Sequence, residues 1–126
     1  MLLLCAMADK QRQDREAKGR KAERLAAWWL RFKGYRILAM REKTPVGEID
    51  IIARRGDMLV FVEVKARKTL ASALEAITPH QRQRIIRAAQ YYIAQHPNLA
   101  NLNLRVDALC LVPRRWPVHM HNICPA

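Results

Sequence analysis

Three charged residues interrupt segments that are otherwise apolar: Asp50, Glu63 and Lys65. A charge buried in a strand without a partner is costly, so such residues need a chemical reason. Two carboxylates that lie close together repel each other unless a cation lies between them, and their hard oxygen atoms suit Mg²⁺ or Mn²⁺. These residue types therefore predict a divalent-metal site with a lysine beside it. The alternative is a structural ion cluster, although apolar residues would often stabilise the fold equally well.

A β-hairpin is the element that must bring these side chains together. Residues 49–53 and 58–64 are apolar and rich in β-branched residues, and Gly56 lies in the turn between them. Side chains alternate along a strand, so Glu63 and Lys65, two positions apart, share one face of the second strand. If the hairpin closes at Gly56, the aspartate of the first strand lies across from the region of Glu63.

The hairpin carries a motif that resembles the PD-(D/E)xK nuclease superfamily, in which an Asp is followed, one hairpin later, by Glu-x-Lys. The two halves here are Ile49-Asp50, with Ile49 in place of the proline, and Glu63-Val64-Lys65. Residues 47–53 and 60–67 resemble more closely the YraN-type family of small bacterial proteins, which is largely uncharacterised and similar to archaeal Holliday-junction resolvases. The resemblance runs from about Gly19 to the C-terminus and is most specific in the hairpin.

This resemblance implies a metal-dependent nuclease that hydrolyses phosphodiester bonds, with branched or damaged DNA among the candidate substrates. Asp50 and Glu63 would bind Mg²⁺ or Mn²⁺, with the backbone carbonyl of Val64 as a further ligand by analogy. The ion would polarise the scissile phosphate and lower the pKa of a bound water. Lys65 would orient that water, help to deprotonate it, or stabilise the transition state, because it shares a face with Glu63.

Two further acidic residues lie near this motif. Glu23 falls on the flank of the apolar face of a helix predicted over Gly19–Lys33, and its position matches the first-helix Glu that related nucleases direct at the metal. The alternative is a helix-edge glutamate paired with Lys or Arg. Glu48, two residues before Asp50, shares that residue's face and could hold a metal-bound water or a lysine.

The same predicted helix carries two adjacent tryptophans, Trp28 and Trp29. We expect them to serve as core and helix-packing residues rather than as platforms for base stacking. Adjacent positions of a helix point in different directions, so at least one of the two lies near the surface.

The remaining segments complete the order helix, strand, hairpin, helix, strand. Thr78 as N-cap, Pro79 at the first helical position and Gln81 in a capping box predict a helix that reaches about Gln95. Alanines at positions 71 and 73, where the family often has Gly and Pro, favour a stiffer and more helical connection and argue against a flexible flap. The other expected elements are a strand at Tyr35–Met40, a loop at Arg41–Val46, a loop or helix at Leu70–Ile77, a strand at Leu104–Val112 and an edge strand at Val118–Ile123. This order predicts an α/β fold with a restriction-endonuclease-like αβββαβ core, a mixed central sheet flanked by helices.

Length and composition indicate a single domain at residues 19–126, preceded by a disordered or helical basic segment at residues 1–18. Met1–Ala8 is apolar but lacks the basic start and the length of a secretory signal, so we interpret it as a disordered or non-native leader. No apolar run reaches the roughly 18 residues that a membrane span needs. Three cysteines, without a Cys-x-x-Cys pair, indicate neither a disulfide framework nor a zinc ribbon and fit a reducing cytoplasm.

The net charge of +12 predicts a polyanionic partner, and nucleic acid, DNA rather than RNA, is the first candidate. The alternative is a basic surface that only keeps the protein soluble. A membrane surface is disfavoured, because no stretch joins a basic face to a strongly apolar one. The basic residues expected to contact phosphates are Arg67, Lys68, Arg82, Arg84 and Arg87.

Other functional classes remain open at this stage. A nucleic-acid-binding module could retain the nuclease fold without turnover. The presence of every expected site residue argues against a loss of catalytic activity. The chain nevertheless departs from the family pattern at Ile49, Ala71, Ala73 and Gln81, and these departures leave a non-catalytic module open. At the position of Gln81, relatives often have a Lys. A basic protein that docks on a protein or ribosomal partner is a third class. Cutting both strands of a junction would require a homodimer.

A second group of polar residues lies near the C-terminus. Asp107 is predicted to be a structural carboxylate at a strand end, with a metal role as the alternative. His119-x-His121 with Cys124 offers donor atoms for zinc, but three donors near a chain end are weak evidence, and an ordinary polar edge is favoured.

Overall fold

The computed structural model describes residues 2–124, apart from the side chains of Leu2 and Asp14. In this part of the chain the helices are α1 (Leu2–Phe32), α2 (Leu70–Glu75) and α3 (Pro79–Gln95), with a short 3₁₀ turn at Pro97–Leu99. The strands are β1 (Arg36–Thr44), β2 (Gly47–Arg55), β3 (Met58–Ala66), β4 (Asn103–Leu111) and β5 (Val118–Met120). They form one sheet in the order β1-β2-β3-β4-β5, in which β3 and β4 are parallel and the other neighbours antiparallel. The predicted α/β fold, a mixed sheet flanked by helices, is confirmed and is consistent with a restriction-endonuclease-like core.

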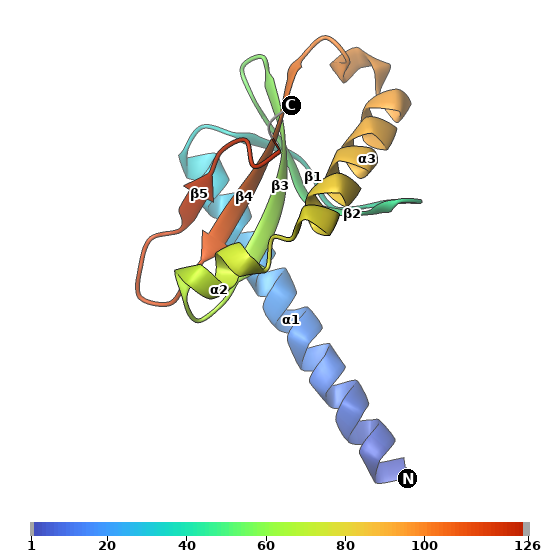
Figure 1. The fold of residues 1–126 in the computed structure, drawn as a ribbon, viewed down its shortest axis with the longest axis vertical. Helices are drawn as coiled ribbons and strands as arrows, with labels where there is room; N and C mark the ends of the chain where they lie inside the picture. Colours follow the sequence, from blue (N-terminus) through green and yellow to red (C-terminus); the bar gives the residue numbers. More distant parts are fainter. Residues whose placement is uncertain (1, 125–126) are drawn as a thin grey trace.

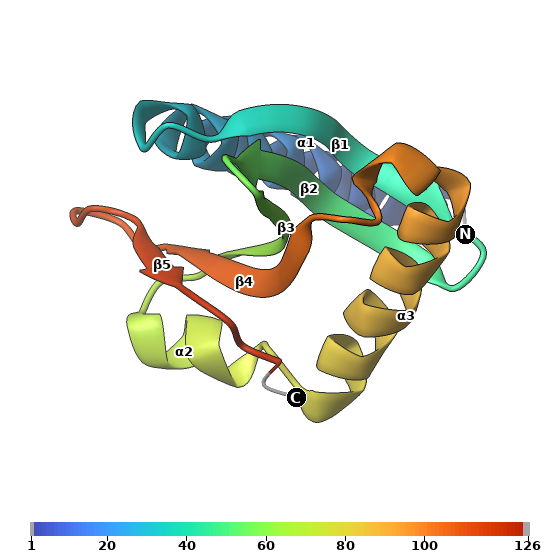
Figure 2. The same cartoon turned by 90° about the horizontal axis from the view of Figure 1, so that it is seen from above.

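The helices cover opposite faces of the sheet (Figure 2). On one face, Ala26 and Leu30 of α1 pack in an apolar cluster with Val62 of β3. On the other face, under α2 and α3, a second cluster includes Phe61 of β3 and Ile85 of α3. Because both faces of the central strands are covered, β2 and β3 are almost continuously apolar in sequence, and the charged residues within them stand out.

Helix α1 is longer than the sequence predicted. It begins at Leu2 rather than near Gly19, so the start predicted for this helix is wrong, and the disordered alternative for the leader is wrong from Leu2 to Ala8. Residues 9–20 are rich in Lys, Arg and Gln, which favour helix even without packing. The N-terminal half of α1 consequently projects beyond the sheet as an exposed rod (Figure 1).

Strand β1 also exceeds its predicted length. The loop expected at Arg41–Val46 is wrong, because β1 stays paired with β2 as far as Thr44 opposite Gly47. Only Pro45 and Val46 remain in the turn, where the Thr44 hydroxyl donates a hydrogen bond of 2.6 Å to the carbonyl of Gly47. Backbone pairing with β2 therefore extends β1 through residues 41–44, and the turn favoured by the proline is limited to Pro45 and Val46.

The second half of the chain follows the prediction closely. The Thr78 hydroxyl accepts a hydrogen bond of 3.2 Å from the Gln81 N–H, as expected for the N-cap of α3, and the helix ends at Gln95. The segment from Leu70 is helical as far as Glu75, which confirms the stiffer alternative for this connection. Among residues 2–124, no helix is both long and apolar enough to cross a bilayer.

Candidate metal centre

Asp50 lies where β2 separates from β3. The two strands pair from Arg55 opposite Met58 to Ile51 opposite Val62, and the next position along β2 is Asp50. There the Asp50 carboxylate, rather than a backbone carbonyl, accepts a hydrogen bond of 2.8 Å from the Val64 N–H. The predicted location of Asp50 across from the region of Glu63 is therefore correct.

The separation of β2 from β3 at Asp50 also affects the backbone of Val64. In an extended strand, the N–H and C=O groups of one residue point toward the same neighbour. Because the Val64 N–H points at Asp50, its carbonyl oxygen points toward β2 as well. Val64 lies beyond the paired register of β2 and β3, which ends at Ile51 opposite Val62.

Three carboxylates converge from two parts of the chain. Glu23 of α1, Glu48 of β2 and Asp50 of β2 each offer an oxygen atom, and these atoms lie within 4.8 Å of one another. Glu23 is buried, Asp50 partly buried and Glu48 exposed. Arg41 of β1 lies against the group, with its Nε 2.7 Å from Glu23 Oε2 and 3.9 Å from Glu48 Oε1.

Glu63 and Lys65 form the adjoining part of the site. Lys65 Nζ lies 3.1 Å from Glu63 Oε1, and both side chains are largely buried. This pair confirms that the two residues share a face of β3. Within the described part of the chain, Glu63 is not among the three carboxylates that come within 4.8 Å of one another. Its charge nevertheless reaches that group, as the pKa of Asp50 indicates.

The carboxylates of the site destabilise one another. Burial and the charge of Glu63 raise the pKa of Asp50 to about 7, and the charge of Glu23 adds to this effect, while the hydrogen bond from Val64 and the charge of Lys65 oppose it. Burial likewise raises the pKa of Glu23, against the lowering effect of the neighbouring guanidinium. A divalent cation among these oxygens would remove the repulsion, because it favours the charged form of every carboxylate around it.

The chain matches a family described as "Uncharacterised protein family UPF0102" over residues 22–111. A "UPF0102 protein" of Chelativorans sp. (strain BNC1) is 53% identical over 121 residues, which cover 96% of this chain and 98% of that protein. The "UPF0102 protein Mmar10_3014" of Maricaulis maris is 54% identical over 110 residues, 87% of each chain. The chain belongs to the UPF0102 family. This result confirms the YraN-type resemblance of the sequence, and the matched span includes the residues of the converging site.

Arg41 is the site residue of this UPF0102 chain that the sequence did not reveal. It was expected in a loop, whereas it lies within β1, with a positive φ of 53° that few residues other than glycine adopt. That backbone conformation brings its guanidinium to Glu23 and Glu48. A signal was present in the sequence, because Glu23 had been expected to pair with an arginine as the alternative to a metal role.

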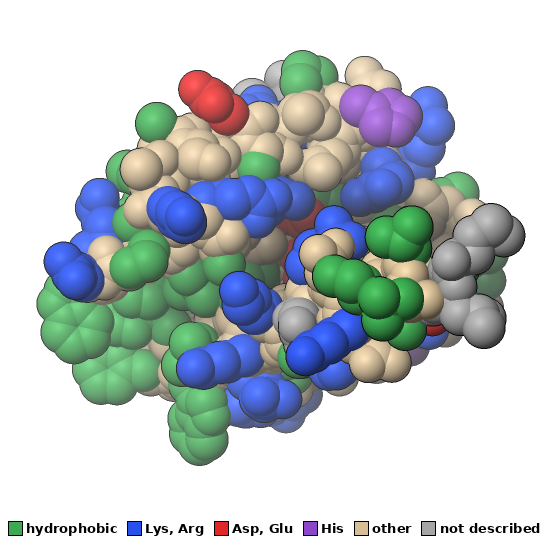
Figure 3. Space-filling view, turned by 90° about the horizontal axis from the view of Figure 1, so that it is seen from below, with side chains coloured by type: hydrophobic (Ala, Val, Ile, Leu, Met, Phe, Trp, Pro, Cys, Tyr) green, Lys and Arg blue, Asp and Glu red, His purple; other side chains and the backbone are tan. Residues whose placement is uncertain are grey.

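The basic residues predicted for nucleic-acid binding lie on two separate segments of the UPF0102 chain, and all are exposed. Arg67 and Lys68 follow the end of β3, and the predicted arginines of α3 are Arg82, Arg84 and Arg87. Arg84 packs against the start of β2, where a Cβ on Gly47 would lie only 2.9 Å from its Cγ. Figure 3 shows Lys and Arg spread over one face, with a little acidic surface in a recess between them.

The C-terminal polar group of the UPF0102 chain is a buried hydrogen-bond network. Asp107 is fully buried in the middle of β4 rather than at a strand end. Its carboxylate accepts hydrogen bonds from Arg105, from His119 Nε2 at 2.7 Å and from the Asn122 N–H at 2.8 Å. Burial raises the pKa of Asp107, but these hydrogen bonds outweigh it and hold the pKa below its usual range.

This network is better suited to holding the fold together than to binding a metal. Asp107, His119 and His121 do come within 4.8 Å of one another. However, the Asp107 oxygens are occupied by hydrogen bonds, and Lys33 Nζ lies 2.8 Å from His119 Nδ1. Cys124 lies apart from them, with its sulfur 3.8 Å from the carbonyl of Arg82. The structural interpretation of Asp107 is therefore favoured.

Proposed function

We propose that this protein is a metal-dependent nuclease that hydrolyses phosphodiester bonds of nucleic acid. The observation that carries the proposal is the crowding of Asp50. Its carboxylate lies with Glu23 and Glu48 within 4.8 Å, under the influence of Glu63 and beside Lys65. A fold that only needed stability would not gather carboxylates so that they raise one another's pKa.

The donor set fits Mg²⁺ or Mn²⁺, because it consists of hard oxygen atoms. Asp50, Glu23 and Glu48 would hold the ion, together with the carbonyl of Val64 and with Glu63, either directly or through water. When bound, the ion would polarise the scissile phosphate and lower the pKa of a bound water.

The other charged residues act around this centre. Lys65, held by its ion pair with Glu63, presents an ammonium group that stabilises negative charge on the phosphate and orients the attacking water. Arg41 balances the charges of Glu23 and Glu48 in the arrangement described here. Its guanidinium and a divalent cation would compete for the same carboxylates.

DNA is proposed as the substrate in preference to RNA, with branched or damaged DNA as the narrower candidate. The exposed basic residues on α3 and after β3 would contact phosphates, and such contacts fix position without reading sequence. Cutting two strands of a junction would require a symmetric dimer. Sedimentation that gives a stable monomer in the presence of DNA would contradict a resolvase activity. Free thiols at Cys5, Cys110 and Cys124 support a cytoplasmic location.

The test is cleavage of supercoiled plasmid and of a synthetic four-way junction with Mg²⁺ or Mn²⁺. We expect cutting that depends on the metal and is lost in Asp50→Ala and Lys65→Ala. Lys10→Ala, which removes an exposed lysine of the projecting part of α1, is the matched control and should keep it. DNA affinity in EDTA should remain in all three variants, because the phosphate contacts lie elsewhere.

The second candidate is a nucleic-acid-binding module without turnover, favoured by the net charge of +12. It predicts no cutting by the wild type and binding that weakens steeply with added salt. Binding that is independent of salt would contradict both candidates. In the nuclease proposal, the catalytic centre and the DNA-binding surface are formed by different residues. If Asp50→Ala lost as much DNA affinity as a variant of the α3 arginines, this separation of roles would be contradicted.

A further inference from the structure

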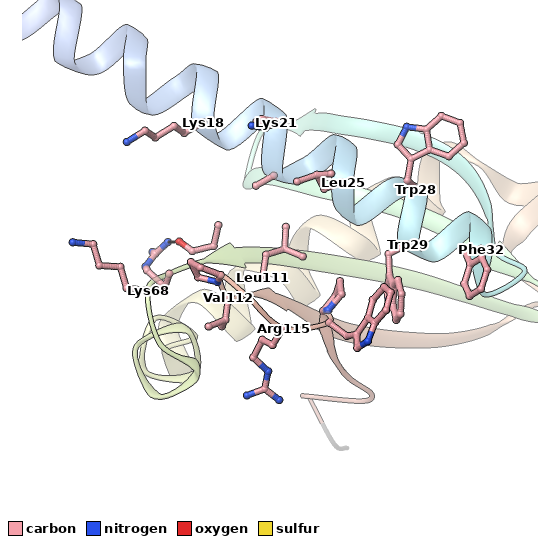
Figure 4. Close-up of a pocket in the computed structure, with 16 residues that line it drawn as sticks. Lys18, Lys21, Leu25, Trp28, Trp29, Phe32, Lys68, Leu111, Val112 and Arg115 are labelled. Carbon is pink, nitrogen blue, oxygen red and sulfur yellow. Dashed lines mark hydrogen bonds between the residues drawn. The ribbon is translucent and has the colours of Figure 1, made fainter.

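A large groove lies beside the candidate metal centre, between α1 and the segment that follows β4 (Figure 4). Its volume of about 1000 Å³ is at the upper end of the range of about 300–1000 Å³ that is usual for ligand sites. Figure 4 shows Lys18 and Lys68 toward one end and Trp29 and Phe32 toward the other. Most of its wall is apolar, and the metal centre already described does not account for it.

Three aromatic rings form a row along this groove. Trp29 stacks on Phe32 with ring centroids 5.9 Å apart and on Trp116 with centroids 5.6 Å apart. Phe32 is 83% exposed and Trp116 78% exposed. Trp28 is exposed as well, which confirms that at least one of the two adjacent tryptophans lies near the surface. Large aromatic side chains that remain open to solvent in a cluster usually mark a binding site.

The charges around the groove indicate what it binds. Among the described residues that line it are five cations and no carboxylate. The cations are Lys18, Lys21, Arg67, Lys68 and Arg115. A second copy of this chain, docked face to face, would bring these like charges together. A polyanion with flat aromatic groups matches both features, and an unpaired strand of nucleic acid has them, since its bases stack on aromatic rings and its phosphates pair with Lys and Arg.

The groove and the candidate metal centre are built from neighbouring positions of the chain. Ala22 lines the groove and Glu23 belongs to the centre; likewise Ala66 lines the groove and follows Lys65 directly. Consecutive residues of a strand point to opposite faces, so a nucleic-acid strand at the centre would reach the groove by passing around the end of β3. Figure 3 shows a patch of hydrophobic side chains on the surface, bordered by Lys and Arg.

We propose that this groove binds an unpaired nucleic-acid strand that adjoins the scissile phosphate. The proposal rests on the proposed nuclease function and narrows its substrate to nucleic acid with a single-stranded segment next to the cut. Bases in a duplex stack on one another and cannot stack on Trp116 and Phe32, so the groove would discriminate against blunt duplex. The five cations would follow the phosphates of the unpaired strand.

The test uses the full-length Lys65→Ala protein, in which cleavage is blocked, with Mg²⁺ present. Fluorescence anisotropy measures its affinity for a labelled oligoadenylate and for a blunt duplex of the same length. Trp116→Ala should weaken binding of the single strand about 5-fold to about 150-fold, the range that corresponds to about 1–3 kcal/mol for each stacked base. Phe32→Ala should act in the same direction, and both should leave duplex binding almost unchanged. Tyr91→Ala, which removes an exposed aromatic ring of α3, is the control and should change neither affinity.

Two results would overturn the proposal. One is that Trp116→Ala leaves single-strand affinity unchanged or weakens both ligands equally. The other is that Trp116→Ala converts a dimer to a monomer in sedimentation, which would make the groove an interface between copies. Because the affinity measurement needs no turnover, a wild type that cuts nothing would refute the nuclease function and leave this result intact. Conversely, metal-dependent cutting without single-strand preference would refute only the groove.

Discussion

Replacing Asp50 with asparagine removes the charge that this fold accommodates least well. Burial and neighbouring carboxylates raise the pKa of Asp50 from its ordinary value of 3.8 to about 7. Asparagine keeps a side-chain oxygen that can accept the hydrogen bond from the Val64 N–H. The substitution therefore removes the charge and preserves the contact. We expect Asp50→Asn to abolish cleavage and to make the metal-free protein more stable than the wild type above about pH 7.

The sign and size of the effect follow from proton linkage. Between the two pKa values the native state holds a proton that the unfolded chain has released, so the free energy of unfolding of the wild type falls as pH rises. The interval from 3.8 to about 7 corresponds to at most about 4 kcal/mol, at about 1.4 kcal/mol for each pKa unit. About one third of this effect is already present at pH 5, and Glu63 and Glu23 share the repulsion, so we expect the variant to gain between about 1 and about 3 kcal/mol at about pH 8 relative to about pH 5.

The assay is urea denaturation of wild type and variant at both pH values in EDTA. Glu75→Gln, which removes an exposed carboxylate of α2, is the control and should behave like the wild type. Added Mg²⁺ should stabilise the wild type more than Asp50→Asn, because the ion binds the native carboxylates. A stability difference between wild type and Asp50→Asn that is the same at both pH values would refute the reasoning, since the carboxylate would then not be strained.

Three further outcomes are expected. Replacing Arg82, Arg84 and Arg87 together by glutamine should weaken DNA binding. In a salt titration, the slope of log affinity against log salt concentration should become less steep by about 0.9 for each lost phosphate contact. An unchanged slope would place the phosphate contacts elsewhere. Thr78→Ala should lower the free energy of unfolding by about 1 kcal/mol through loss of the α3 N-cap, measured by urea denaturation. Asp107→Asn should cost about 3–5 kcal/mol at neutral pH, because it leaves the largely buried Arg105 guanidinium without its carboxylate. Since the pKa of Asp107 is lowered in the fold, its stabilising contribution is lost as pH falls through that pKa, and the penalty of the variant should shrink in acid; a constant penalty would contradict the pairing.

Local patterns in the sequence were sufficient wherever neighbours in the chain fix the structure. The hairpin followed from apolar runs on both sides of Gly56, and the start of α3 followed from Thr78 and Pro79. The expectation that Glu63 and Lys65 share a face needed only the alternation of a strand. Elements that depend on distant partners were harder to predict, because pairing with β2 extends β1 through residues 41–44, where a loop had been expected.

The sequence by itself determined the fold class, the hairpin and the residue types of the candidate centre, because periodicity, turns and charges in apolar segments are local properties. Only the tertiary structure decided which carboxylates meet. It placed Glu48 with Glu23 and Asp50, brought Arg41 against them, and put Trp116 beside the aromatic face of α1. These contacts join residues far apart in the chain, and their geometry depends on where β2 separates from β3 and on how α1 packs across the sheet. No local pattern carries that information.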